Sequence, residues 1–135
     1  MNDFGLKAGM IGEARTMVTE ENTALKFGSG TIKVYATPAM IGLMEKASIN
    51  CVDNSLPEGF ASVGTKVEIK HLAATPIGME VAAEAELLEA DGPKLKFRIT
   101  AYDSKEKIGE GTHSRYIVKL DEFLKKAENK LYYLD

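Results

Sequence analysis

The feature that most constrains the fold is a series of four alternating segments that follows one long apolar helix. Apolar and polar side chains alternate through 62–73, 79–90, 94–102 and 108–120. This two-residue period is typical of antiparallel strands with one covered face and one face in water. Short turns that contain glycine, proline or charged residues join the segments.

One long helix is available to cover the apolar face of these strands. Thr37 and Pro38 predict its start, with the threonine as cap and the proline in the first turn. The segment NSLPEG predicts its end near residue 54. Gly42, Lys46, Asn50 and Asp53 form one narrow polar stripe at about 100° per residue, and apolar side chains fill most of the remaining circumference.

The order of elements then predicts an α+β hotdog fold, in which a curved antiparallel sheet wraps around a central helix. A further strand is expected within 9–20, a loop or lid over 26–36, and a short helix from about 121. In the first of the four alternating segments, Val63, Val67, Ile69 and His71 are expected to share the covered face.

Length, charge and cysteine content set limits on function. The 135 residues fit one domain over 1–135, and the net charge of −3 argues against a nucleic-acid partner. No apolar run reaches the roughly 18 residues of a membrane span, and the first residues lack the features of a signal peptide. The single cysteine, Cys51, offers no disulfide and no metal motif. We therefore expect a cytoplasmic protein without a metal or cofactor.

Glu45 lies off the polar stripe of the predicted helix. It is roughly 100° away from Lys46 around the axis, beside Ile41, Ile49 and Val52. Apolar surroundings disfavour the ionised form of a carboxylate and make it a stronger proton acceptor, so Glu45 is a candidate general base. The alternative is an ordinary surface glutamate, if the true helix phase differs by one residue.

His71 and Thr37 are the next candidates. His71 lies at an inward strand position and needs a hydrogen-bond partner, either as a core histidine or as a proton-transfer group facing Glu45. Thr37 either caps the helix or presents its hydroxyl at the helix start, where free N–H groups favour a polarised carbonyl. On the last strand, a packing or solvated role is expected for His113, and Arg115 could meet a carboxylate or a phosphate.

With these residues the chain resembles hotdog-fold acyl-CoA thioesterases, and within them the fluoroacetyl-CoA thioesterase type. The resemblance runs from about Gly9 to Phe123 and is densest in ATPAMIGLMEKAS, SVGTKVEIKHLAATPIGMEVAAEAEL and KEKIGEGTHSR. The spacing of eight residues between Thr37 and Glu45, and of twenty-six between Glu45 and His71, matches the catalytic triad of that family.

The resemblance implies an acyl-CoA substrate and a homodimer with its active sites at the interface. Thr37, Glu45 and His71 would be catalytic, the Gly64 N–H would help polarise the thioester carbonyl, and Arg115 would lie near the substrate. Either Glu45 and His71 activate water, or Glu45 or Thr37 attacks the carbonyl first.

The resemblance has one departure. The fluoroacetyl-specific enzyme carries phenylalanines in the lid before its central helix, whereas GSGTIKVY has none after Phe27. We therefore expect a thioesterase for a short or compact acyl group rather than a fluoroacetyl-specific enzyme. Three alternatives remain open: a non-catalytic acyl-CoA-binding hotdog module, a hotdog acyl-CoA dehydratase, and an assembly protein without a ligand.

Overall fold

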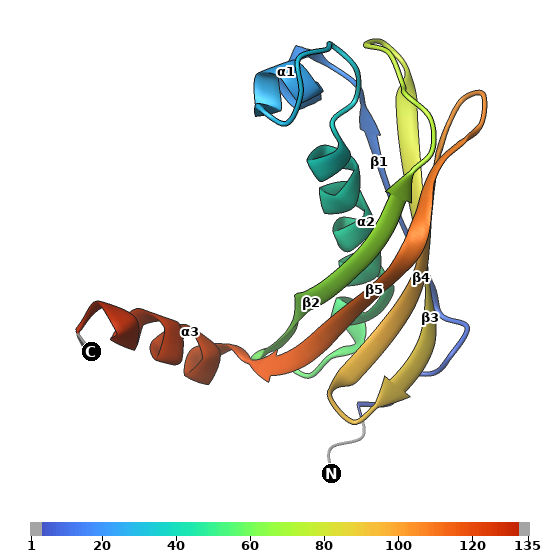
Figure 1. Ribbon diagram of the computed structural model, residues 1–135. Coiled ribbons are helices and arrows are strands. Elements are labelled where there is room, and N and C mark those ends of the chain that lie inside the picture. Colours follow the sequence, from blue (N-terminus) through green and yellow to red (C-terminus); the bar gives the residue numbers. More distant parts are fainter. Residues whose placement is uncertain (1–3, 133–135) are drawn as a thin grey trace.

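A five-stranded antiparallel sheet and one central helix make up the body of the protein in a computed structural model, which describes residues 4–132 (Figure 1). The strand order is β1-β3-β4-β5-β2. The strands are β1 Ile11–Met17, β2 Phe60–His71, β3 Glu80–Asp91, β4 Lys94–Asp103 and β5 Lys107–Lys119. The helices are α1 Ala24–Phe27, α2 Thr37–Val52 and α3 Leu120–Glu128, with 3₁₀ turns at Glu20–Asn22, Asp53–Ser55 and Asn129–Leu131. The predicted hotdog fold is confirmed.

Helix α2 lies in the concave face of the curved sheet (Figure 1). Its fully buried apolar residues meet the inward side chains of β3 and β4, and this contact forms the core. Gly12 of β1 permits the closest approach, because a Cβ atom there would collide with the backbone of Ala47 and Cys51 in α2. The polar stripe of Gly42, Lys46 and Asn50 is exposed, as the helical period predicts.

A β-bulge in β2 changes which of its side chains face the helix. Pairing with β5 shifts between Gly64 and Lys66, so that Thr65 is an extra residue. Val67 pairs with the buried His113, whereas Val63 pairs with the exposed Tyr116. The expectation that Val63 shares the face of Val67 is therefore wrong, because one inserted residue reverses the alternation. The same insertion places Gly64 on the helix-facing side.

The start of α2 also differs from the sequence expectation. Ala36 is the N-cap residue and makes no side-chain cap, and Thr37 is already helical. The Thr37 hydroxyl is therefore not the predicted cap and is available for another contact.

The segment before α2 folds over the start of that helix. It contains α1 and a loop that isolated bridges tie down, between Thr23 and Tyr35 and between Val34 and Pro76. The residues expected as a loop or lid are thus the end of α1 and this anchored loop.

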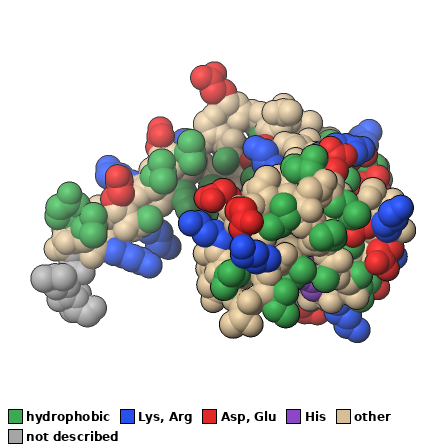
Figure 2. Space-filling model, turned by 90° about the horizontal axis from the view of Figure 1, so that it is seen from above, with side chains coloured by type: hydrophobic (Ala, Val, Ile, Leu, Met, Phe, Trp, Pro, Cys, Tyr) green, Lys and Arg blue, Asp and Glu red, His purple; other side chains and the backbone are tan. Residues whose placement is uncertain are grey.

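Helix α3 projects from the body beyond the strand β2 (Figure 1). All of its residues are exposed, and Figure 2 shows apolar, acidic and basic side chains along this arm. No helix within residues 4–132 is long and apolar enough to cross a membrane.

Candidate active site

Thr37 and His71 form the first half of the candidate site. Thr37 lies in the first turn of α2 and His71 is the last residue of β2, and Thr37 Oγ1 lies 2.7 Å from His71 Nδ1. A hydroxyl within hydrogen-bond reach of an imidazole is the arrangement in which a weak nucleophile is activated by a base.

Burial favours the neutral form of the His71 imidazole. Burial lowers the pKa of His71 from its ordinary value, and the backbone of Ala73 opposes this shift in part. Its Nε2 is buried and has no hydrogen-bond partner among residues 4–132. If Nδ1 accepts the Thr37 hydroxyl proton, Nε2 carries the ring proton and needs an acceptor.

A cavity of about 390 Å³ opens beside this pair. Its wall comes from α1, the loop before α2 and the end of β2. The lining residues are Ala24, Ser29, Val34, Tyr35, Thr37, His71, Leu72, Ala73 and Ala74. Burial raises the pKa of Tyr35 to about 12, so its phenol is neutral, and its hydroxyl donates to the Ala39 carbonyl at 3.3 Å. The cavity therefore offers mainly uncharged surface next to the hydroxyl–imidazole pair.

Glu45 and Gly64 form the second half of the site. A Cβ atom on Gly64 would lie 2.6 Å from Glu45 Oε2, so only glycine lets the carboxylate approach the strand this closely. The Glu45 side chain is 40% exposed. The expectation of a glutamate enclosed by Ile41, Ile49 and Val52 is wrong, because Val52 faces the core and Ile41, Glu45 and Ile49 form a half-exposed flank of α2.

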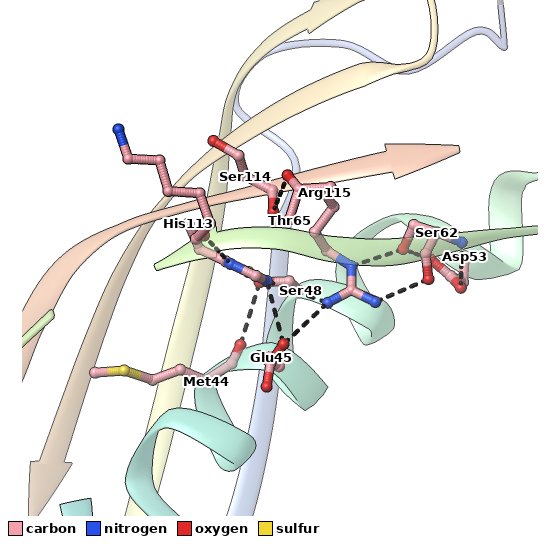
Figure 3. Close-up of polar contacts among 10 residues, drawn as sticks. Met44, Glu45, Ser48, Asp53, Ser62, Thr65, His113, Ser114 and Arg115 are labelled. Carbon is pink, nitrogen blue, oxygen red and sulfur yellow. Dashed lines mark hydrogen bonds and ion pairs between the residues drawn. The ribbon is translucent and has the colours of Figure 1, made fainter. Parts of the chain in front are cut away.

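A buried guanidinium lies behind this carboxylate (Figure 3). Arg115 Nε donates to Ser62 Oγ at 2.8 Å, and Nη2 donates to the Ser62 carbonyl at 2.8 Å. Nη1 donates to His113 Nε2 at 3.1 Å and lies 3.8 Å from Glu45 Oε2. Arg115 is only 5% exposed, so it faces the carboxylate of Glu45 rather than solvent.

His113 completes this second half from β5. Its Nδ1 donates to the Lys66 carbonyl at 2.8 Å, and its ring stacks on Phe97. Burial lowers the pKa of His113, and the Arg115 charge lowers it further against the opposing effects of the Lys66 carbonyl and Glu45. The neutral ring is therefore a hydrogen-bond acceptor for Arg115, and its 3.9 Å approach to Glu45 is not an ion pair.

The two halves are separate within one chain. Eight residues of α-helix separate Thr37 from Glu45, which corresponds to about 12 Å along the axis. The contacts of Glu45 in the described chain are with Gly64, His113 and Arg115 and do not include the expected partner His71.

The family model of fluoroacetyl-CoA-specific thioesterases matches residues 18–121 of the chain. The chain belongs to this family. The match includes both halves of the site, and it ends before most of the arm formed by α3. This membership agrees with the resemblance that Thr37, Glu45 and His71 carry in the sequence.

Three known proteins are similar to this chain in sequence or structure. The fluoroacetyl-CoA thioesterase of Streptantibioticus cattleyicolor is 40% identical over 98 residues, which are 73% of this chain and 70% of that protein. A solved structure of the fluoroacetyl-CoA thioesterase FlK superimposes with a TM-score of 0.88 and 32% identity, over 93% of this chain and 98% of that one. A thioesterase superfamily member of Thermus thermophilus has a TM-score of 0.84 and 28% identity, over 98% of each chain.

Sequence reasoning identified the residues that could react but missed those that hold them. Thr37 and His71 lie together, and so do Glu45, Gly64 and Arg115. Three residues behind Arg115 were not predicted to serve the site, namely Asp53, Ser62 and His113. The bulge obscured the inward position of Ser62, while the shared parity of His113 and Arg115 on β5 was a usable signal.

Proposed function

We propose that the chain is a thioesterase that hydrolyses short or compact acyl-CoA thioesters to the free acid and coenzyme A. The observation that carries this proposal is the 2.7 Å contact between the Thr37 hydroxyl and the neutral His71 imidazole, in a chain of the fluoroacetyl-CoA-specific thioesterase family. A module that only binds acyl-CoA would not need a hydroxyl paired with a base.

The Thr37–His71 pair supports nucleophilic catalysis. His71 Nδ1 takes the hydroxyl proton while Thr37 Oγ1 attacks the thioester carbonyl, and coenzyme A leaves as a thiol after protonation. Water then hydrolyses the acyl–Thr37 ester and releases the acid. Because a thiolate is a good leaving group, the site mainly has to position the carbonyl and stabilise its oxyanion. The free N–H groups at the start of α2, and Gly64 as the family implies, are suited to the second task.

A second copy of the chain is proposed to complete the site. β2 has a strand neighbour on one side only in the described part of the chain, so its other edge can pair. Antiparallel pairing of two β2 strands about a two-fold axis near Glu68 brings His71 of one copy opposite Gly64 of the other, with Thr65 absorbed in the bulge. Glu45 of the partner subunit would then accept a hydrogen bond from the N–H at His71 Nε2.

Packing under α2 supports a compact acyl group. Met40 and Met44 are fully buried, and Met40 Sδ lies 2.6 Å from the position of a Cβ atom on Gly109. These side chains fill the space between helix and sheet, so a long acyl chain has no room there. The lid carries no aromatic side chain from 28 to 34, and acyl groups without fluorine are therefore included in the proposed range.

A thiol-release assay over a panel of acyl-CoA esters tests the activity and its range. We expect turnover of acetyl-, propionyl- or fluoroacetyl-CoA and little turnover of palmitoyl-CoA. Hydrolysis of palmitoyl-CoA faster than that of the short esters would contradict the proposed acyl size. Absence of thiol release from every ester would contradict the proposed thioesterase activity.

Mixing two inactive variants tests the shared site. Glu45→Gln and His71→Ala chains are each expected to form homodimers with about 1% of wild-type activity or less. In a mixed dimer, one site keeps both native residues and the other loses both, so random exchange should restore about a quarter of wild-type activity. If each site lay within one chain, mixing would restore nothing.

The cytoplasm is the proposed location. Cys51 is a buried free thiol, which is typical of a reducing compartment, and acyl-CoA esters are intracellular compounds. Fractionation of cells that express the chain would test this.

A further inference from the structure

A continuous series of buried and half-buried polar contacts runs from the end of α2 to Glu45. Asp53 Oδ1 accepts from Ser62 Oγ at 2.6 Å, and Asp53 Oδ2 accepts from the Ser62 N–H at 3.2 Å. Ser62 in turn accepts from Arg115 through both its hydroxyl and its carbonyl. Arg115 is the last member of this series of contacts and lies beside Glu45.

Burial of a charged side chain such as Arg115 is not an economical way to stabilise a fold. A guanidinium that is 5% exposed has lost most of its hydration, and replacement of such buried polar groups by apolar ones is often neutral or stabilising. Three of the five N–H donors of Arg115 are used by Ser62 and His113. These bonds fix the plane of the guanidinium, and Nη1 keeps one further N–H on the side of Glu45.

Glu45 itself has no other anchor of this kind. No hydrogen bond to its carboxylate is found among residues 4–132, and its side chain is 40% exposed. Its Oε2 lies 3.8 Å from Arg115 Nη1 and 3.9 Å from His113 Nε2, in the space that Gly64 leaves open. The position of the carboxylate is therefore set by the charge of Arg115 and by the shape around Gly64.

We propose that Asp53, Ser62 and His113 are positioning residues, which act through Arg115 to hold the Glu45 carboxylate in its catalytic place. The inference rests on the proposed function, since it assigns a purpose to residues behind the carboxylate that is proposed to orient His71. It assigns Arg115 to Glu45 and not to a phosphate of coenzyme A, because its donors point into the protein.

The test uses a pair of substitutions with the same shape at Ser62. Ser62→Thr keeps the hydroxyl between Asp53 and Arg115, while Ser62→Val removes it and adds the same bulk. We expect Ser62→Val to lower kcat by about 10- to 100-fold, the scale of a small misplacement of a catalytic group. Ser62→Thr should retain most of kcat, and KM should change little in both. Ser114→Thr and Ser114→Val, on the outward side of β5, are the matched controls and should behave alike.

A double-mutant cycle separates positioning from general damage to the fold. In a Glu45→Gln background, Ser62→Val should cause no further loss, because the carboxylate that it positions is already gone. An equal loss in both backgrounds, or equal kcat for Ser62→Thr and Ser62→Val, would overturn the inference.

The outcomes also distinguish this inference from the proposed function. If the wild-type chain hydrolyses acyl-CoA esters and Glu45→Gln is impaired, the function stands even when the Ser62 pair shows no difference. If Ser62→Val does not fold, Asp53→Asn takes its place, since it keeps the size of the half-buried Asp53 but removes its charge and one of the two oxygens that accept from Ser62. Full kcat in Asp53→Asn together with a Ser62→Val variant that fails to fold would also overturn the inference.

Discussion

At the scale of single residues, the Thr37 hydroxyl does not cap helix α2, although Thr37 lies at the start of that helix. Ala36 occupies the N-cap, so Thr37→Val should leave the melting temperature almost unchanged, whereas loss of a true threonine cap costs about 1 kcal/mol. We expect kcat to fall by about 10²-fold or more, because Thr37→Val removes the attacking oxygen, and Thr37→Ser to keep most of it. Thiol release and thermal denaturation of the two variants check this. Near-full turnover by Thr37→Val would remove Thr37 from the mechanism.

The protonation of His71 gives a second test at this scale. Burial lowers its pKa, so the neutral imidazole that can accept the Thr37 proton persists as the pH falls toward and below 6.5. A carboxylate of the partner subunit at Nε2 would raise that pKa. Glu45→Gln should therefore move the titration of His71 to lower pH than in the wild type, and His71 should titrate below 6.5 in the variant.

The chain contains only two histidines, so NMR can follow this titration directly. A His113→Gln variant assigns the two signals. An unchanged His71 titration in Glu45→Gln would show that the two side chains do not meet in the assembled protein. In both the wild type and Glu45→Gln, turnover should be lost as the pH falls through the pKa of His71, because the protonated ring cannot accept the Thr37 proton.

At the scale of elements, two glycines have opposite structural roles. Gly12 lies against the backbone of α2, and Gly42 is an exposed helical position where an added Cβ atom would meet no other atom within 4 Å. Gly12→Ala should separate β1 from α2 and destabilise the fold by about 1–3 kcal/mol or more, as overpacking does. Gly42→Ala should stabilise it by about 0.5–1 kcal/mol, because alanine is the better helix former. Chemical denaturation measures both, and a neutral Gly12→Ala would contradict the packing described for β1.

The strands include both the best and the poorest predictions made from the sequence. Alternation is a property of many residues together, so the four long strands and their covered face could be predicted despite local errors. The bulge at Thr65 could not be predicted, because one extra residue between Gly64 and Lys66 leaves no distinctive sequence pattern. It moves every earlier side chain of β2 to the opposite face of the sheet. That reversal is why Ser62, and with it the path to Asp53, was not expected at the site.

At the scale of the whole molecule, β2 and the half-exposed flank of α2 predict a two-fold dimer. Light scattering should give about twice the chain mass of 14.7 kDa. Val67→Asp adds a carboxylate to each strand close to the proposed axis and should shift the protein toward monomer with loss of activity. Tyr102→Asp, at a similarly exposed apolar position on β4, is the control and should remain dimeric. A wild-type mass near 14.7 kDa would contradict the dimer.

The separation of Thr37 from Glu45 along α2 makes the specific activity depend on the protein concentration. When two halves of a site belong to different copies, an isolated chain has no complete site, and the fraction of working enzyme follows mass action. Specific activity should then fall on dilution below the dissociation constant of the pair and recover on concentration, while the rate per chain of a self-contained enzyme stays constant. In a cell, the level of expression would set not only how much protein is present but what fraction of it is an enzyme.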